Sequence, residues 1–98
     1  MDRPEYPLSM TINERRVTRI LIDQHYREKH SDLDDQKIIG LVKQLDGENF
    51  PIETTRGEFQ YFRAEPVYLS DRPYRVILML CLSDDFLGVV NAFRVDER

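Results

Sequence analysis

Two arginines stand at the outer ends of the most apolar part of the chain. Arg75 lies near the start of YRVILMLCL and Arg94 near the end of FLGVVNAFRV, and the turn SDD separates the two runs. In an antiparallel hairpin these two positions come close, so both guanidinium groups are expected at one end of the sheet. Paired guanidinium groups suit an intervening phosphate or carboxylate. The alternative is that each arginine ends a strand and reaches water, or pairs with a carboxylate such as Glu65 or Glu97.

The two histidines, His25 and His30, are the other candidates for chemistry. Either could act as a general acid or base, because the ordinary pKa of histidine lies near neutrality. No nucleophile motif accompanies them, and Cys81 lies inside an apolar run, where a buried and unreactive thiol is expected. Neither HExxH, a Cys/His pair nor a glycine-rich phosphate loop occurs. The sequence therefore predicts no metal and no cofactor.

Local patterns predict the elements that would position these residues. Residues 16–23 are rich in β-branched and aliphatic side chains and predict a first strand, which we expect to join the sheet at an edge. The polar residues 24–31 predict a short helix. Residues 34–47 predict a main helix of about three turns, with aspartates at its start and a glycine at its end.

The second half of the chain predicts a three-stranded antiparallel meander. Pro66 predicts an end, a bulge or an edge position in the first of these strands, and Gly88 predicts a bulge in the last. Tyr61, Phe62 and Tyr68 are either core residues or an aromatic patch for a partner.

Together these elements predict an α+β fold, in which an antiparallel meander sheet of about four strands packs against one main helix and a short helix. Residues 1–13 contain two prolines and lack periodicity, so they predict a loose N-terminal arm. Residues 14–98 are expected to form a single α+β domain.

Composition indicates a soluble protein of the reducing cytoplasm. The 98 residues contain one cysteine, so no intrachain disulfide can form, and neither a signal peptide nor a membrane-spanning segment is recognisable. The net charge is −4 and the isoelectric point is about 5.1. This acidic balance weighs against a general affinity for nucleic acid.

The order of the elements resembles that of small toxin-like nucleases grouped with barnase, EndoU, colicin RNases and RelE, especially the BrnT-like branch. The resemblance covers roughly residues 16–95 and is carried by ILIDQHYREKH, LDDQKIIGLVKQLDG, PYRVILMLCL and GVVNAFRV. It implies metal-independent RNA cleavage by a bacterial toxin, which an antitoxin would cover. Such toxins tend to be basic, whereas this chain is acidic.

Carried over residue by residue, the resemblance implies a role for five side chains. His25 would be the acid or base. Lys29 and His30 would support it as a KH pair. Arg75 and Arg94 would stabilise charge on the phosphate.

Two hypotheses follow. The first and more specific is a toxin-like, metal-independent ribonuclease of a toxin–antitoxin system. The alternative is a non-catalytic acidic interaction protein, immunity- or antitoxin-like, that binds a basic protein partner.

Overall fold

The computed structural model describes residues 3–28 and 32–95. The strands are β1 (Glu5–Ile12), β2 (Arg15–Ile22), β3 (Thr54–Arg56), β4 (Phe59–Leu69), β5 (Arg72–Cys81) and β6 (Phe86–Arg94). The helical elements are the 3-10 helix η1 (Gln24–Glu28) and the α-helix α1 (Asp35–Lys43).

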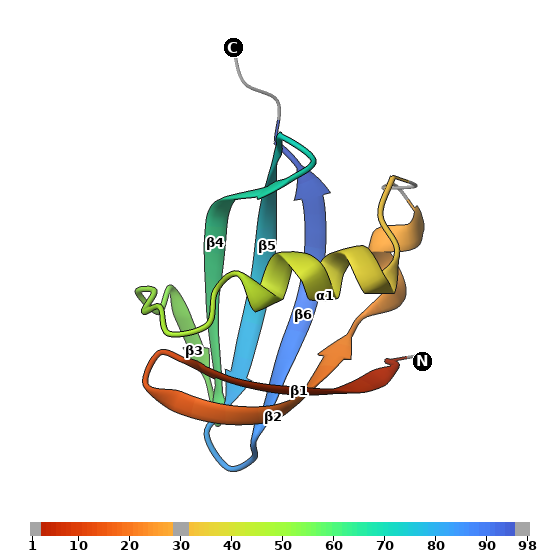
Figure 1. The fold of residues 1–98 in the computed structure, drawn as a ribbon. Helices are drawn as coiled ribbons and strands as arrows, with labels where there is room; N and C mark the ends of the chain where they lie inside the picture. Colours follow the sequence, from red (N-terminus) through yellow and green to blue (C-terminus); the bar gives the residue numbers. More distant parts are fainter. Residues whose placement is uncertain (1–2, 29–31, 96–98) are drawn as a thin grey trace.

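All six strands belong to one mixed sheet, in which they lie side by side in the order β1-β2-β6-β5-β4-β3 (Figure 1). The sheet curls into a half-barrel, and α1 lies across it. The expected meander of about four antiparallel strands with two helices is therefore wrong. Of the residues that the structure describes, strands account for 54% and helical residues for 16%.

The largest correction concerns the N-terminal residues, because most of the expected loose arm forms β1. Leu8, Met10 and Ile12 alternate with more exposed neighbours and are buried, which gives this strand one apolar face. β1 pairs antiparallel with β2, and β2 pairs in parallel with β6. The first predicted strand is thus an interior strand of the sheet, not an edge strand.

The main helix is confirmed, although it is shorter than expected. The side chain of Asp34 caps its start by accepting a hydrogen bond of 2.8 Å from the backbone N–H of Lys37. Ile38, Leu41 and Val42 lie on its buried face. The α-helix ends at Lys43, four residues before Gly47, which adopts a positive φ of 87° in the turn that follows.

Two irregularities in the C-terminal meander decide which side chains share a face. The register of β4 against β5 shifts between Ala64 and Val67, which confirms the bulge expected near Pro66. In β6 the extra residue is Val90 and not Gly88, because Ile77 pairs with Asn91 while Leu78 pairs with Val89.

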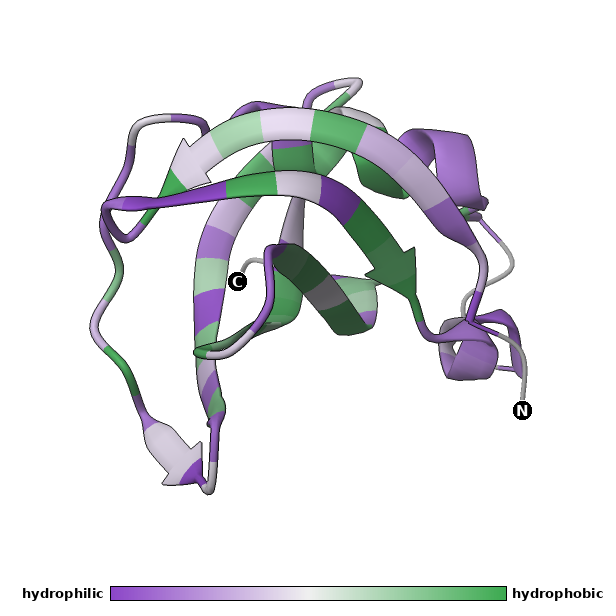
Figure 2. Ribbon diagram, turned by 90° about the horizontal axis from the view of Figure 1, so that it is seen from below, coloured by the Kyte–Doolittle hydropathy of each residue, from purple (hydrophilic) through white to green (hydrophobic). Residues whose placement is uncertain are grey.

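The core lies between the concave face of the curled sheet and α1, and Figure 2 shows the strands arching around the helix. Along β5, Tyr74, Val76, Leu78 and Leu80 are buried in this core, while the residues between them are half-buried on the outer, convex face. Among the described residues, no helix has the length and apolarity needed to cross a membrane.

Candidate functional site

The structure does not bring Arg75 and Arg94 together. Arg75 lies opposite Phe93 in the β5–β6 ladder, and Arg94 lies opposite Tyr74. Residues that face each other across a ladder share one side of the sheet, and successive residues alternate between sides. Arg75 therefore projects from the outer face and Arg94 from the face of the buried Tyr74. The expected meeting of the two guanidinium groups is wrong.

Arg75 instead forms a bidentate ion pair with Glu65 on β4. Its Nη2 donates a hydrogen bond of 2.9 Å to Oε2 of Glu65, and its Nε donates to Oε1. The guanidinium also lies over the ring of Phe93, 5.5 Å from its centroid. The hydrogen bond from Arg75 lowers the pKa of Glu65 below its usual value. The alternative that this arginine pairs with Glu65 is thus confirmed.

His25 lies on η1 with a side chain that is 61% exposed. Its backbone N–H donates to Asp23 Oδ1 at 2.9 Å, and its Nδ1 is 3.8 Å from Glu28 Oε1. Lys29 and His30 lie outside the described residues. The contacts of His25 are thus with its own segment, while those of Arg75 are with β4 and β6.

The outer face presents a different assembly, one that crosses four strands. Leu21 of β2 pairs with Gly88 of β6, Gly88 pairs with Met79 of β5, and Met79 pairs with Tyr61 of β4. These residues therefore form a single row on the outer face. Gly88 has no side chain, and the end of the Met79 side chain lies over its position.

A groove with a volume of about 260 Å³ lies over this row. We call it the outer groove, and most of its walls are apolar side chains that are half-buried rather than buried. It is lined by Arg3, Leu21, Asp23, Phe59, Tyr61, Met79, Phe86, Gly88, Val89 and Val90. Of the three aromatic residues expected in the core or in a surface patch, Phe62 is buried in the core, Tyr68 is exposed and Tyr61 lines the groove. The row itself depends on pairings between distant segments.

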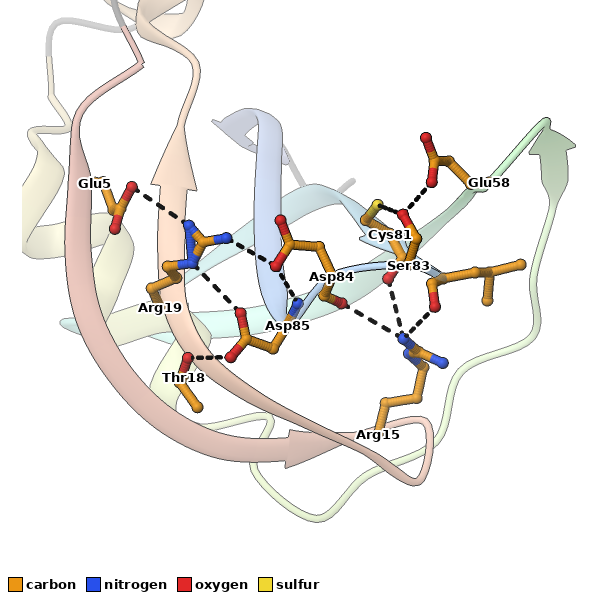
Figure 3. A network of polar contacts seen from close by, with 10 residues as sticks. Glu5, Arg15, Thr18, Arg19, Glu58, Cys81, Ser83, Asp84 and Asp85 are labelled. Atoms are coloured by element: carbon orange, nitrogen blue, oxygen red, sulfur yellow. Dashed lines mark hydrogen bonds and ion pairs between the residues drawn. The ribbon is translucent and has the colours of Figure 1, made fainter.

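An ionic network lies beside the outer groove, at the turn between β5 and β6 (Figure 3). Arg19 Nη2 is 2.9 Å from Asp84 Oδ1, and the same guanidinium approaches Asp85 and Glu5 at 3.4 Å and 3.5 Å. It also lies over the ring of Phe86. The backbone N–H of Asp85 and then Arg19 lower the pKa of Asp84.

The same turn is held by a second arginine and by a serine. Arg15 Nη2 donates to the carbonyl oxygens of Cys81 and Leu82, at 3.0 Å and 3.2 Å. The Ser83 hydroxyl donates to Glu58 and lies 3.4 Å from Cys81 Sγ. We call the segment of residues 82–85, together with Glu58 and Glu5, the acidic turn. Asp84 and Asp85 are thus turn residues, as expected, and also ion-pair partners.

A buried carboxylate on the other side of the sheet joins three elements. Asp35, at the start of α1, accepts hydrogen bonds from Tyr26 of η1 at 2.6 Å, Tyr6 of β1 at 2.5 Å and Gln24 Nε2 at 3.1 Å. Burial by itself would raise the pKa of Asp35, but these hydrogen bonds outweigh it and the pKa is lowered. Burial, followed by the bond to Asp35, raises the pKa of Tyr26 to about 12.

This arrangement satisfies the carboxylate and gives it a structural role. Asp35 is 7% exposed and Tyr26 is fully buried, so neither side chain presents its polar atoms to an open surface. Within the described residues, no group of three or more His, Cys, Asp and Glu side chains is placed to hold a metal ion.

Comparisons with known proteins add no further assignment. A scan against protein-family models, a search of curated proteins and a search of solved structures each found no significant match.

Proposed function

We propose that this chain is a non-catalytic interaction domain that binds a protein partner through the outer groove. The observation that carries the proposal is the row on the outer face, where a groove of about 260 Å³ is lined by the half-buried side chains of Leu21, Met79 and Tyr61. Aromatic and methionine side chains are enriched in the central parts of protein interfaces.

The shape of the groove also favours a partner side chain over a free small molecule. Sites for drug-sized ligands usually enclose about 300–1,000 Å³. The outer groove has about 260 Å³ and lies on an open sheet face. This is the geometry of a shallow pocket that accepts one bulky residue of a partner, as interface anchors do.

The interaction role corresponds to the immunity- or antitoxin-like alternative drawn from the sequence, and the net charge of −4 fits a basic partner. The ribonuclease hypothesis stays a prediction. Arg75 and Arg94 project from opposite faces, so they do not converge on one phosphate. The cytoplasm is the compartment we expect, because Cys81 is a free, buried thiol.

Photo-crosslinking tests the proposal even though the partner has yet to be identified. A photoreactive phenylalanine analogue replaces Tyr61 in the groove, and in a control chain it replaces Ile52, an exposed apolar residue outside the groove lining. We expect a discrete crosslinked protein from position 61 and none from position 52. That protein is then purified and titrated against the unmodified chain.

Truncation of the groove walls gives the quantitative test. Met79→Ala and Tyr61→Ala should each raise the Kd by about tenfold, which corresponds to about 1.4 kcal/mol. Ile52→Ala should leave the Kd unchanged. Equal crosslinking from both positions, or cleavage of RNA by the purified chain that His25→Ala abolishes, would contradict the interaction role.

A further inference from the structure

The outer groove borders the acidic turn, because two residues that line the groove directly follow acidic residues of the turn. Phe86 lines the groove and directly follows Asp85, and Phe59 lines it and directly follows Glu58. The Ser83 hydroxyl donates a hydrogen bond to Glu58, which connects this carboxylate to residues 82–85. A segment that occupies the groove at Phe59 and Phe86 therefore has these carboxylates beside it.

Negative charge exceeds positive charge in this network. Arg15 donates to backbone carbonyl oxygens of the turn, and Arg19 is shared among several carboxylates. The carboxylates of the network are those of Glu5, Glu58, Asp84 and Asp85. Arg56 lies opposite Phe59 on β3 and limits the acidic region on that side.

We propose that the outer groove takes an extended, basic protein segment, which places one bulky apolar side chain in the groove and a Lys or Arg against the acidic turn. This inference rests on the proposed interaction function and names the chemistry of the partner. The apolar side chain contacts Met79 and Tyr61, while the cation lies near Glu58.

Charge favours a basic partner over a second copy of the chain. A copy carries the same net charge of −4 and the same acidic turn, so its approach is opposed by repulsion between like charges. A basic segment is attracted instead. Its association should be steered by charge and should weaken as salt is added.

A displayed library of random peptides, each about a dozen residues long, is the probe. The bait is the whole chain, and enriched peptides are resynthesised and titrated at low and at physiological salt. We expect the enriched peptides to combine a bulky apolar residue with Lys or Arg. Their Kd should rise about tenfold with Met79→Ala and severalfold with Glu58→Lys.

Matched variants separate charge from packing. Glu48→Lys makes the same charge change on an exposed residue outside the groove and the turn, and it should have little effect on the Kd. The Kd of the Glu58→Gln variant should fall between that of the unmodified chain and that of Glu58→Lys. Amide NMR spectra of each variant verify the fold before titration.

Two results would overturn this inference without affecting the interaction function. In the first, the peptides that bind in the groove show no enrichment in Lys or Arg. In the second, Glu58→Lys leaves the Kd unchanged. Self-association of the chain that Met79→Ala abolishes would also overturn it, in favour of a second copy. The interaction function itself fails in a separate way, when crosslinks from position 61 are no different from those at position 52.

Discussion

Met79 lies directly opposite Gly88 across the β5–β6 ladder, and its terminal carbon would be 2.8 Å from a Cβ placed at Gly88. The methionine side chain thus covers the position at which Gly88 lacks a side chain. The contact involves the far end of a flexible side chain, which can move aside. The depth of the outer groove therefore depends on this pair.

The Gly88–Met79 contact predicts coupling between the two positions. Gly88→Ala should be less favourable in the unmodified chain than in a Met79→Ala background, by about 0.5–1 kcal/mol, because the new methyl group displaces the end of Met79 only where it is present. Urea denaturation of the four chains measures this difference. Strict additivity of the two changes would show that the side chains do not compete for the same space.

The buried carboxylate at the start of α1 should make a large contribution to stability. Asp35→Ala removes the acceptor for the buried Tyr26 hydroxyl, so we expect a loss of about 3 kcal/mol in the free energy of unfolding. Asp34→Ala is the matched control, because this neighbour caps the helix from an exposed position and should cost only about 1 kcal/mol. Equal losses from the two variants would argue against a structural role of the network.

The same carboxylate predicts a dependence of stability on pH. The pKa of Asp35 in the folded chain lies below its ordinary value of 3.8. Its stabilisation is therefore fully present above that ordinary value and is lost as the pH falls through the folded-state pKa. Urea midpoints between about pH 6 and pH 2 should fall less steeply in Asp35→Asn than in the unmodified chain. Identical profiles would show that other carboxylates account for the slope.

The Arg75–Glu65 pair should behave as a partly exposed ion pair rather than as part of a phosphate site. The two side chains are 30% and 31% exposed, so their coupling should be small and should weaken as salt screens it. A double-mutant cycle of Arg75→Ala and Glu65→Ala at low salt and at about 1 M salt measures it. Coupling that persists at high salt would contradict this assignment. The effects of Arg75→Ala and Arg94→Ala on the free energy of unfolding should be additive, because the two side chains project from opposite faces.

Several elements are predictable from nearby residues alone. The helical spacing of Ile38, Leu41 and Val42 predicts α1, and the capping preference of aspartate predicts its start at Asp34. The missing N–H of Pro66 predicts the bulge in β4. In each case the cause lies within a few residues of its effect.

β1 was missed although its signal was present. Leu8, Met10 and Ile12 alternate as in a half-buried strand, but Pro4 and Pro7 suggested an irregular arm. A proline is tolerated in an edge strand, where one side of the backbone needs no ladder partner, and β1 is an edge strand of this sheet.

The chain's own sequence thus determined the acidic balance, the helix, the apolar strands β5 and β6 and the presence of arginines at their ends. Only the tertiary structure decided what those arginines contact and where the groove lies. The bulge at Val90 sets which side chains of β6 share a face, and the register of β4 brings Glu65 to Arg75. The parallel pairing of β2 with β6 places Leu21 beside Gly88. Such pairings join distant segments, and the local pattern of each strand is compatible with several partners and registers.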